Sequence, residues 1–384
     1  MNSKNLGEIR SEINAIDEEL VRLFARRLDI VSEVAASKRE AGAPVLDPAR
    51  EREILSRVAD KVGPDLEIPA RIFFNTLFDI SRARQRAALN PPGPLAGEIA
   101  AAMESSGGKF PSRAVVACQG AEGAYSQQAA TKLFAFPTIL YFNSFDDVFT
   151  AVEKGMCPYG ILPIENSAAG SVAAVYDLMV QHRFHIVRAI RQRINHVLLA
   201  PRGVGIEDVK EVISHQHALA QCNTFFKNHP GWTLTPAANT AVAARNLAKS
   251  ARRDLAAVAS RECAELYGLD ILEEDISNVA TNYTRFFCIA KDLEIYPDAR
   301  KISIMLTLPH RPGALYGVMS KFAAIDVNLT KLESRPIPGM DFEFRFTLDL
   351  EASARDPQVV KLLCELASDP SIEQFAFLGA YNEN

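Results

Sequence analysis

Residues 6–41 read LGEIRSEINAIDEELVRLFARRLDIVSEVAASKREA, and this stretch sets the architecture of the N-terminal part of the chain. It contains no proline and a single glycine near its start. Apolar residues recur every three or four positions, at 9, 13, 16, 20, 23, 30 and 34, which is typical of an amphipathic helix. Such a helix is about 50 Å long. It buries its apolar stripe best against a second copy, so we expect an intertwined dimer.

One member of the stripe is a cation, Arg27. A buried guanidinium costs free energy unless an anion meets it, although a snorkelling or paired arginine is also an ordinary explanation. Lys38 lies 11 residues further on and returns to within about 20° of the same face. The two cations therefore favour binding of a small dianion. Arg10 points about 100° away, so we expect it to reach the partner chain's site.

Two shorter helical segments follow. Asp47 and Pro48 form a typical helix start, and Ser81 and Gln85 share one helix face. With the cations, these residues resemble in type, order and spacing the active-site set of the all-helical chorismate mutase family. The resemblance covers residues 1–90 and rests on Arg10, Arg27, Lys38, Asp47, Arg50, Glu51, Ser81 and Gln85.

This resemblance implies the Claisen rearrangement of chorismate to prephenate. By resemblance, Arg27 and an arginine from the partner subunit grip the substrate carboxylates. Lys38 and Gln85 face the ether oxygen, and Asp47 or Glu51 receives the hydroxyl. The residue types suit the reaction, because it needs a held conformer and stabilised charge on the ether oxygen, but no nucleophile, proton transfer or cofactor.

The rest of the chain changes character. The Asn90-Pro-Pro-Gly-Pro run stops the last helix, and residues 91–112 are predicted to form a flexible linker that can include a short helix. Short apolar strands alternate with helical stretches over residues 113–292, which indicates an α/β domain with a second lobe at about 193–280. Residues 300–384 follow a strand-helix-strand-strand-helix-strand order, which is typical of an α+β ferredoxin-like fold.

Polar residues gather at three strand-to-helix turns of the α/β domain and in Thr284-Arg-Phe. These segments resemble prephenate dehydratase, a family with two α/β lobes similar to a type II periplasmic binding protein. The resemblance implies decarboxylating dehydration of prephenate to phenylpyruvate, with Thr284 as the catalytic hydroxyl. It also implies catalytic roles for Asn166, Ser214 and Gln221 and cleft-lining roles for Tyr125, Ser126 and Thr240. Arg285 either binds a substrate carboxylate or forms a salt bridge.

Two motifs mark the C-terminal domain, at a strand-helix turn and at the end of the second strand. They resemble the effector motifs of the ACT regulatory domain attached to this enzyme. By resemblance the phenylalanine site is formed by Gly313, Ala314, Leu315, Glu333, Ser334 and Arg335. This implies feedback inhibition of phenylalanine biosynthesis, with L-phenylalanine as effector, and side-by-side pairing of subunits in a homo-oligomer.

Composition excludes other classes. The net charge of −5 argues against a nucleic-acid binder. No apolar run reaches the roughly 20 residues that cross a bilayer, and the polar N-terminus does not resemble a secretory signal, so we expect neither membrane association nor export. Six scattered cysteines suggest reduced thiols in the cytoplasm. Neither they nor His215 and His217 have metal-ligand companions, so we expect no metal and no cofactor.

Two alternatives stay open. A mutase fused to a dehydrogenase would need a nucleotide-binding glycine fingerprint, and GAEGAYS at residues 120–126 lacks its spacing. A non-catalytic aromatic-metabolite sensor, built from a binding-protein fold and an ACT domain, would be expected to lose the polar catalytic set while keeping the pocket.

Overall fold

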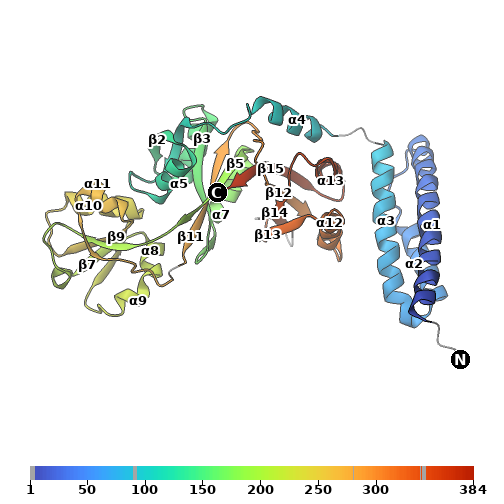
Figure 1. Ribbon diagram of the computed structural model, residues 1–384, viewed down its shortest axis with the longest axis horizontal. Coiled ribbons are helices and arrows are strands. Elements are labelled where there is room, and N and C mark those ends of the chain that lie inside the picture. Colours follow the sequence, from blue (N-terminus) through green and yellow to red (C-terminus); the bar gives the residue numbers. More distant parts are fainter. Residues whose placement is uncertain (1–4, 90–92, 280, 338, 340–342) are drawn as a thin grey trace.

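The computed structural model describes residues 5–89, 93–279, 281–337, 339 and 343–384. The predicted boundary at 90–92 and residue 280, at the end of the predicted second lobe, lie outside the described residues. The helical domain stands at one end of an elongated molecule and the second α/β lobe at the other (Figure 1). Within the described part of the chain, no helix is both long and apolar enough to cross a membrane.

The helical domain consists of α1 (Leu6–Ala41), α2 (Pro48–Val62), the 3-10 turn η1 (Pro64–Leu66) and α3 (Glu67–Leu89). Asn5 and Glu8 form a capping box at the start of α1, and Gly42 ends the helix with a left-handed φ of 61°. Both α1 and α2 pack against α3. The all-helical fold expected for this part of the chain is confirmed.

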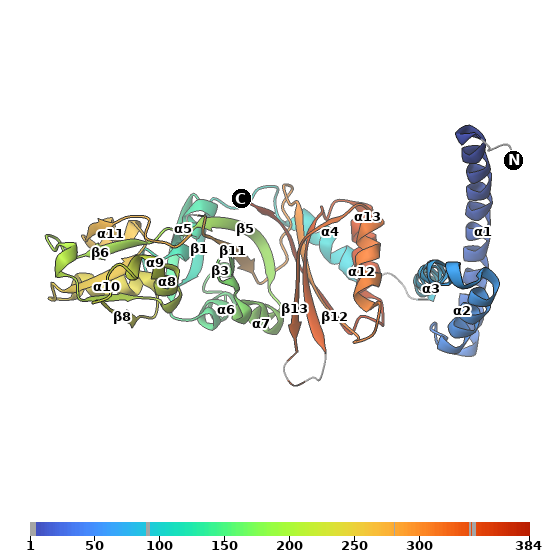
Figure 2. The same ribbon diagram turned by 90° about the horizontal axis from the view of Figure 1, so that it is seen from below.

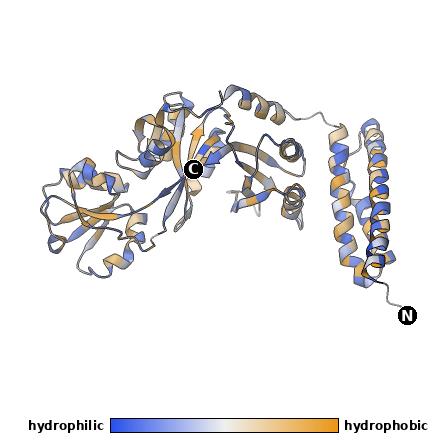
Figure 3. Ribbon diagram, viewed as in Figure 1, coloured by the Kyte–Doolittle hydropathy of each residue, from blue (hydrophilic) through white to orange (hydrophobic). Residues whose placement is uncertain are grey.

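The apolar stripe of α1 is largely exposed. Along this fully described helix only Val31 and Ala35 are buried. Ile13, Ile16 and Leu20 keep 51%, 60% and 48% of their surface exposed. Part of α1 projects beyond α2 and α3 (Figure 2), and hydrophobic residues recur along it (Figure 3). A contiguous apolar stripe of this kind is typical of a surface that binds another chain.

The first α/β lobe is built on five strands in the order β5-β11-β3-β1-β2. β1 runs parallel to β2 and β3, whereas β11 runs antiparallel to β3 and β5. The strands are β1 (Arg113–Gln119), β2 (Phe136–Phe142), β3 (Tyr159–Asn166), β5 (His185–Arg193) and β11 (Tyr283–Ala290), and the short β4 (Gly170–Ser171) pairs with β3. The helices are α5 (Tyr125–Leu133), α6 (Phe145–Glu153) and α7 (Ala173–His182).

The second lobe is inserted between β5 and β11. Its sheet has the order β10-β6-β9-β7-β8. The strands are β6 (Val197–Ala200), β7 (Glu211–Ser214), β8 (Thr233–Pro236), β9 (Leu255–Ala259) and β10 (Asp270–Glu273). The helices are η2 (Ile206–Asp208), α8 (Gln216–Gln221), α9 (Asn223–Phe226), α10 (Thr240–Lys249) and α11 (Glu262–Tyr267). The two-lobed α/β architecture is thus confirmed.

The C-terminal domain has the expected βαββαβ order and an antiparallel sheet, β13-β14-β12-β15. Its elements are β12 (Lys301–Leu308), α12 (Ala314–Ala323), β13 (Asn328–Pro336), β14 (Phe344–Glu351), α13 (Pro357–Ala367) and β15 (Gln374–Glu383). The end of β15 pairs in parallel with β5 of the first lobe. The two domains therefore share one continuous sheet.

Part of the predicted linker is not a free tether. Residues 95–105 form α4 (Leu95–Ser105), which packs against α13. Ile99 is 1% exposed and belongs to the core of the C-terminal domain. Ser106 Oγ accepts a hydrogen bond of 2.9 Å from the backbone nitrogen of Ile295. The expectation of a flexible linker is wrong for this segment, because its apolar face has a core to join.

Candidate active sites

The first candidate site lies between α1 and α3. Arg27 donates to Ser81 Oγ at 2.5 Å and to the backbone oxygen of Leu77 at 3.4 Å. Gln85 Nε2 donates to the backbone oxygen of Ser81 at 3.3 Å. Ser81 and Gln85 are both buried. Ser81 and Gln85, which are four residues apart on α3, therefore lie beside Arg27, the cation in the apolar stripe of α1.

Arg27 is the cation of this site. Desolvation by partial burial lowers the pKa of Arg27, and among the described residues no carboxylate pairs with it. The Oε1 atom of Gln85 is buried without a hydrogen-bond partner in the same described set. A half-buried cation without a carboxylate partner is typical of a site that binds an anionic ligand, whereas the Gln85 oxygen can only accept and needs a donor.

Lys38 and Asp47 lie where α1 gives way to α2. Lys38 Nζ donates to the backbone oxygen of Val45 at 2.6 Å. Asp47 caps α2 by accepting a 3.0 Å hydrogen bond from the backbone nitrogen of Arg50. The capping bond fixes the Asp47 carboxylate at the start of α2. The Lys38 ammonium is held at Val45, two residues before Asp47. Both side chains thus have a structural partner in addition to their predicted role.

Glu51 has a partner that the sequence did not suggest. It forms an ion pair with Arg82 of α3, and Arg82 also pairs with Asp79. Arg50 pairs with Glu53 at 2.7 Å. Arg82 lies one residue after Ser81, so it points away from the Arg27 side of the helix, and helical periodicity gave no reason to select it.

Arg10 stands apart from this site. It is exposed, and no hydrogen bond or ion pair to it occurs among the described residues. Seventeen residues of helix place it about 25 Å from Arg27 along α1. Within one chain the two arginines do not meet.

The second candidate site is a cavity of about 570 Å³ between the two α/β lobes. Its wall includes six of the predicted residues: Tyr125, Ser126, Asn166, Gln221, Thr240 and Thr284. They come from the starts of α5 and α10, the end of β3, the end of α8 and the start of β11. Five separate elements therefore deliver polar side chains to one cleft.

Hydrogen bonds tie the cleft residues together. Asn166 Nδ2 donates to Thr284 Oγ1 at 2.9 Å. Gln221 Nε2 donates to Asn166 Oδ1 at 3.2 Å, which joins the second lobe to the first. Tyr125 donates its hydroxyl to the backbone oxygen of Asn195 at 2.5 Å, and burial raises its pKa. The Tyr125 hydroxyl is therefore neutral near neutral pH.

The described wall of the cavity consists of apolar, amide, hydroxyl and imidazole side chains. Among the described residues, no Asp, Glu, Lys or Arg lines it. The first residues of three helices do, namely Tyr125 of α5, Ala173 of α7 and Thr240 of α10. Helix N-termini present free backbone N–H groups and a partial positive charge, so they can receive carboxylates without a counter-ion. His215 and His217 add two imidazoles to the same wall.

The structure corrects one predicted catalytic residue. Ser214 is fully buried, and its hydroxyl donates to the backbone oxygen of Val258 at 2.6 Å. It does not line the cavity. The serine ends β7 with its side chain inside the lobe, where its hydroxyl bonds a neighbouring strand.

The structure also corrects the substrate-binding role of Arg285 and supports its salt-bridge alternative. The guanidinium points away from the cleft, donates to Glu383 at 2.6 Å and to the Tyr381 hydroxyl at 3.0 Å, and pairs with Asp349. Burial alone would lower the pKa of Arg285, but these three groups outweigh it and the pKa is raised. The residue joins the first lobe to the C-terminal domain.

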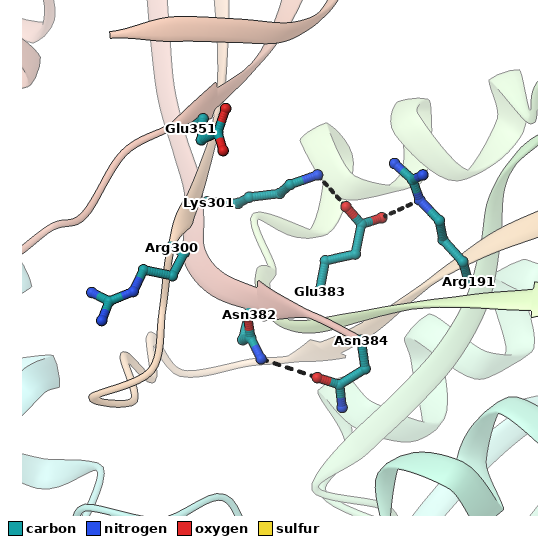
Figure 4. A pocket seen from close by; sticks show the side chains of 7 residues that line it. All are labelled: Arg191, Arg300, Lys301, Glu351, Asn382, Glu383 and Asn384. Atoms are coloured by element: carbon teal, nitrogen blue, oxygen red, sulfur yellow. Dashed lines mark hydrogen bonds and ion pairs between the residues drawn. The ribbon is translucent and has the colours of Figure 1, made fainter. Parts of the chain in front are cut away.

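This joint includes a second, smaller cavity of about 380 Å³. Figure 4 shows Glu383 lying between Lys301 and Arg191, with ion pairs to both. Arg300 and Glu351 complete the charged part of its wall. Because Glu383 pairs with Arg191 of the first lobe and with Lys301 of the C-terminal domain, we interpret this cavity as part of the contact between the two domains.

Sequence reasoning missed two buried residues of the cleft. His196 is 2% exposed, lines the cavity, and its Nε2 lies 3.0 Å from Gln221 Oε1. Asn282 donates to the same oxygen at 3.2 Å. Strand periodicity could have indicated Asn282, because it lies two residues before Thr284 and shares its face. A lone histidine in Asn-His-Val-Leu carried no such signal.

The predicted effector residues fall at two places in the C-terminal domain. Gly313 caps α12 with a left-handed φ of 81°, and Ala314 and Leu315 begin that helix partly buried. Glu333, Ser334 and Arg335 lie in β13, the edge strand of the sheet. β13 runs in the same direction as β12, so both places lie at the same end of the sheet.

β13 also contacts the wall of the cleft. Glu333 accepts a 2.7 Å hydrogen bond from Ser171 Oγ, and Arg335 donates to the backbone oxygen of Ala173 at 3.0 Å. Ser171 and Ala173 both line the cavity between the lobes. Lys331 adds a 3.0 Å ion pair to Glu165, next to Asn166. The edge strand of the C-terminal domain is thereby in direct contact with the candidate active site.

Comparison with known proteins identifies the families to which these parts of the chain are similar. The prephenate dehydratase family matches residues 116–294, and the family described as chorismate mutase type II matches residues 9–86. The chain is 30% identical to the bifunctional chorismate mutase/prephenate dehydratase of Escherichia coli (strain K12), over 95% of this chain and 94% of that protein. It is 38% identical to the chloroplastic arogenate dehydratase/prephenate dehydratase 2 of Arabidopsis thaliana, over 76% of this chain and 77% of that one.

A solved structure is also similar to a large part of the chain. Prephenate dehydratase from Arthrobacter aurescens, in complex with L-Phe, superposes with a TM-score of 0.63 at 29% identity. The match covers 70% of this chain and 89% of that one.

Proposed function

The chain belongs to the family of bifunctional chorismate mutase/prephenate dehydratases, and on that premise we propose that it carries out two consecutive steps of phenylalanine biosynthesis. The helical domain rearranges chorismate to prephenate. The cleft between the lobes removes carbon dioxide and water from prephenate to give phenylpyruvate. The observation that carries this proposal is that one chain holds an anion-seeking Arg27 site and a separate polar cleft around Thr284.

The mutase site holds the reactive conformer of chorismate and stabilises the charge that develops on its ether oxygen. Arg27 grips a carboxylate, and Arg10 of the partner subunit grips the other. Gln85 and Lys38 stabilise the charge that grows on the ether oxygen as it leaves, since both present N–H donors. Asp47 or Glu51 receives the substrate hydroxyl, and Glu51 is held by its ion pair with Arg82. Ser81 fixes Arg27 in place. Each group acts on charge or conformation, and none exchanges a proton with the substrate.

This mutase site requires two chains. The exposed stripe of α1 and the distance between Arg10 and Arg27 both support an intertwined homodimer. The edge strand β13 supports a second contact between subunits, at the C-terminal domains.

In the cleft, the hydroxyl of Thr284 helps the leaving group. Decarboxylation supplies the electron pair that aromatises the ring and expels the ring hydroxyl, and a proton from Thr284 turns that hydroxyl into water. Asn166 donates to Thr284 Oγ1, so the threonine oxygen is stabilised as its proton departs. The carboxylates of the substrate dianion lie at the N-termini of α5, α7 and α10.

Prephenate fits this cleft better than arogenate does. Arogenate carries an ammonium group where prephenate carries a keto oxygen. A buried ammonium needs a carboxylate partner, and no Asp or Glu lines the cavity among the described residues. The uncharged wall therefore favours the keto acid.

The C-terminal domain acts as an ACT-type sensor of phenylalanine. Its βαββαβ order, the left-handed Gly313 and the position of Glu333 to Arg335 support this role. Contacts from β13 to Ser171 and Ala173 give the domain a direct hold on the cleft wall. The enzyme works in the cytoplasm, which the six unpaired cysteines support.

The deciding experiment offers the purified chain chorismate alone, then prephenate and arogenate separately. We expect phenylpyruvate, which absorbs strongly in alkali, from the first two without any added cofactor. Arogenate should react at least about tenfold more slowly than prephenate, given the cost of burying an unpaired ammonium. Unchanged chorismate and prephenate would instead identify a non-catalytic sensor.

A further inference from the structure

The orientation of the Asn166 side chain is fixed by the backbone. Its Oδ1 accepts hydrogen bonds from the backbone nitrogens of Ala168 at 3.0 Å and Ala169 at 2.9 Å. A backbone N–H can only donate, so the oxygen of this amide must face that turn. Its Nδ2 must then face Thr284, to which it donates at 2.9 Å.

This polarity decides what Thr284 can do. Its oxygen already accepts from Asn166, and among the described residues Oγ1 has no other partner. Its own proton is therefore free to point into the cavity, as a general acid requires. If Asn166 were reversed, its carbonyl would draw that proton away from the substrate.

The same polarity passes to Gln221 and Asn282. Asn166 Nδ2 donates to Asn282 Oδ1 at 2.8 Å, so Asn282 turns its Nδ2 toward Gln221 Oε1. Gln221 in turn donates from Nε2 to Asn166 Oδ1. The amides of Asn166, Asn282 and Gln221 thus form a closed ring of three hydrogen bonds. Reversing any one amide would place two donors or two acceptors against each other.

His196 is bonded to this ring through Gln221. Gln221 Oε1 is an acceptor, so the imidazole nitrogen 3.0 Å from it must carry a proton. Desolvation lowers the pKa of His196, and the hydrogen bond to Gln221 only partly offsets it. The histidine is therefore neutral near neutral pH, with its proton on Nε2. The Tyr125 ring lies edge-on to the imidazole, with 5.9 Å between the ring centroids, and the Tyr125 hydroxyl donates to the backbone oxygen of Asn195.

We propose that His196 is a positioning residue of the dehydration step. Its Nε2–H holds Gln221 Oε1, so that Gln221 presents Nε2 to Asn166 across the lobe boundary. Asn166, whose amide the backbone orients, keeps the Thr284 proton directed at the leaving hydroxyl. His196 belongs to the segment where the chain enters the second lobe, so its hold on Gln221 acts on Asn166 only when the lobes are together. This inference rests on the proposed dehydratase function of the same cleft.

The test measures prephenate turnover and chorismate turnover in full-length variants. His196→Phe removes the donor while keeping a ring against Tyr125. We expect the dehydratase kcat to fall about 10- to 100-fold, the loss expected for one buried hydrogen bond, while KM stays within about threefold. His196→Gln, which offers an amide N–H in place of Nε2–H, should return kcat to within about fivefold of the unaltered chain. Mutase activity in the same chain reports that the helical domain is intact, and an unchanged KM for prephenate reports that the cleft is folded.

His229→Phe is the matched control, because His229 stacks on Trp232 at 4.0 Å and lies outside the cleft wall. It should leave both activities within about twofold. The proposal is overturned if His196→Phe changes KM alone, or if His196→Gln is no better than His196→Phe. Nitrogen-15 NMR of the unaltered protein decides independently of any variant, since a proton found on Nδ1 with Nε2 bare contradicts the ring. If the unaltered chain fails to turn over prephenate at all, the proposed function itself has failed.

Discussion

Thr284 and Arg285 are neighbours in the chain, yet they act on opposite sides of strand β11. Successive residues of a strand point to opposite faces. Thr284 meets Asn166 at the cleft, whereas Arg285 meets Asp349 and Glu383 of the C-terminal domain. One short motif thus carries both the proposed acid and an anchor to the neighbouring domain.

At this scale the two activities should separate by single substitutions. Arg27→Ala should lower mutase kcat/KM at least about 100-fold, because the substrate dianion loses a buried cation, and leave prephenate turnover unchanged. Thr284→Val should lower dehydratase kcat at least about 100-fold and spare the mutase, because it removes the proton donor. Steady-state assays of both reactions on each variant are the measurement. Loss of both activities in either variant would show that the domains depend on each other.

The helix α1 has an apolar face that its own chain leaves largely uncovered. It buries two residues against its own chain and leaves a long apolar stripe exposed. An exposed stripe on a helix of about 50 Å is explained by a partner helix. The same partner would deliver Arg10 to a site that it does not reach within its own chain.

Subunit mixing tests this arrangement. Arg10→Ala and Arg27→Ala chains should each lack mutase activity, but co-expressed chains should recover up to about a quarter of it. Half of the dimers are then mixed, and in these one of two sites carries neither substitution. Activity per subunit is measured on the unseparated mixture, and the mixed dimers isolated by their two tags should carry about half. If mixing restores nothing while each variant remains dimeric, Arg10 and Arg27 belong to one chain's site.

On the scale of the whole molecule, the C-terminal domain is joined unequally to the two enzymes. It shares a continuous sheet with the first α/β lobe and touches the cleft wall through β13. To the helical domain it makes an ion pair of 2.8 Å between Arg86 and Asp369. A change in the C-terminal domain therefore has a firmer route to the dehydratase than to the mutase.

Phenylalanine should accordingly inhibit the two reactions to different degrees. Titration with L-phenylalanine, using prephenate and chorismate as separate substrates, should depress dehydratase activity several-fold more than mutase activity. Sedimentation at the same concentrations should show a shift in the oligomer distribution, because the proposed site lies near the edge strand. A flat response at millimolar phenylalanine would refute the sensing role, and stronger inhibition of the mutase would refute the route.

The sequence by itself determined the order of the domains and the face of each helix. The spacing of three and four on residues 6–41 and the βαββαβ order are local patterns, and local patterns survive folding. It also indicated Arg27, because a cation in an apolar stripe is anomalous wherever the helix packs. The resemblances supplied Asn166, Gln221 and Thr284, which the structure brings together in one cleft.

Only the tertiary structure decided which side of a buried sheet a polar residue faces. β11 is buried on both sides, so no alternation shows that Arg285 points into the joint. The four residues of β7 are too few for the sequence alone to show that Ser214 points into the lobe. Only the structure revealed the packing of α4, whose core lies some 200 residues further along the chain. The role of His196 likewise depends on two backbone N–H groups in another lobe, because a hydrogen-bond polarity is a property of the assembled ring and of no single residue.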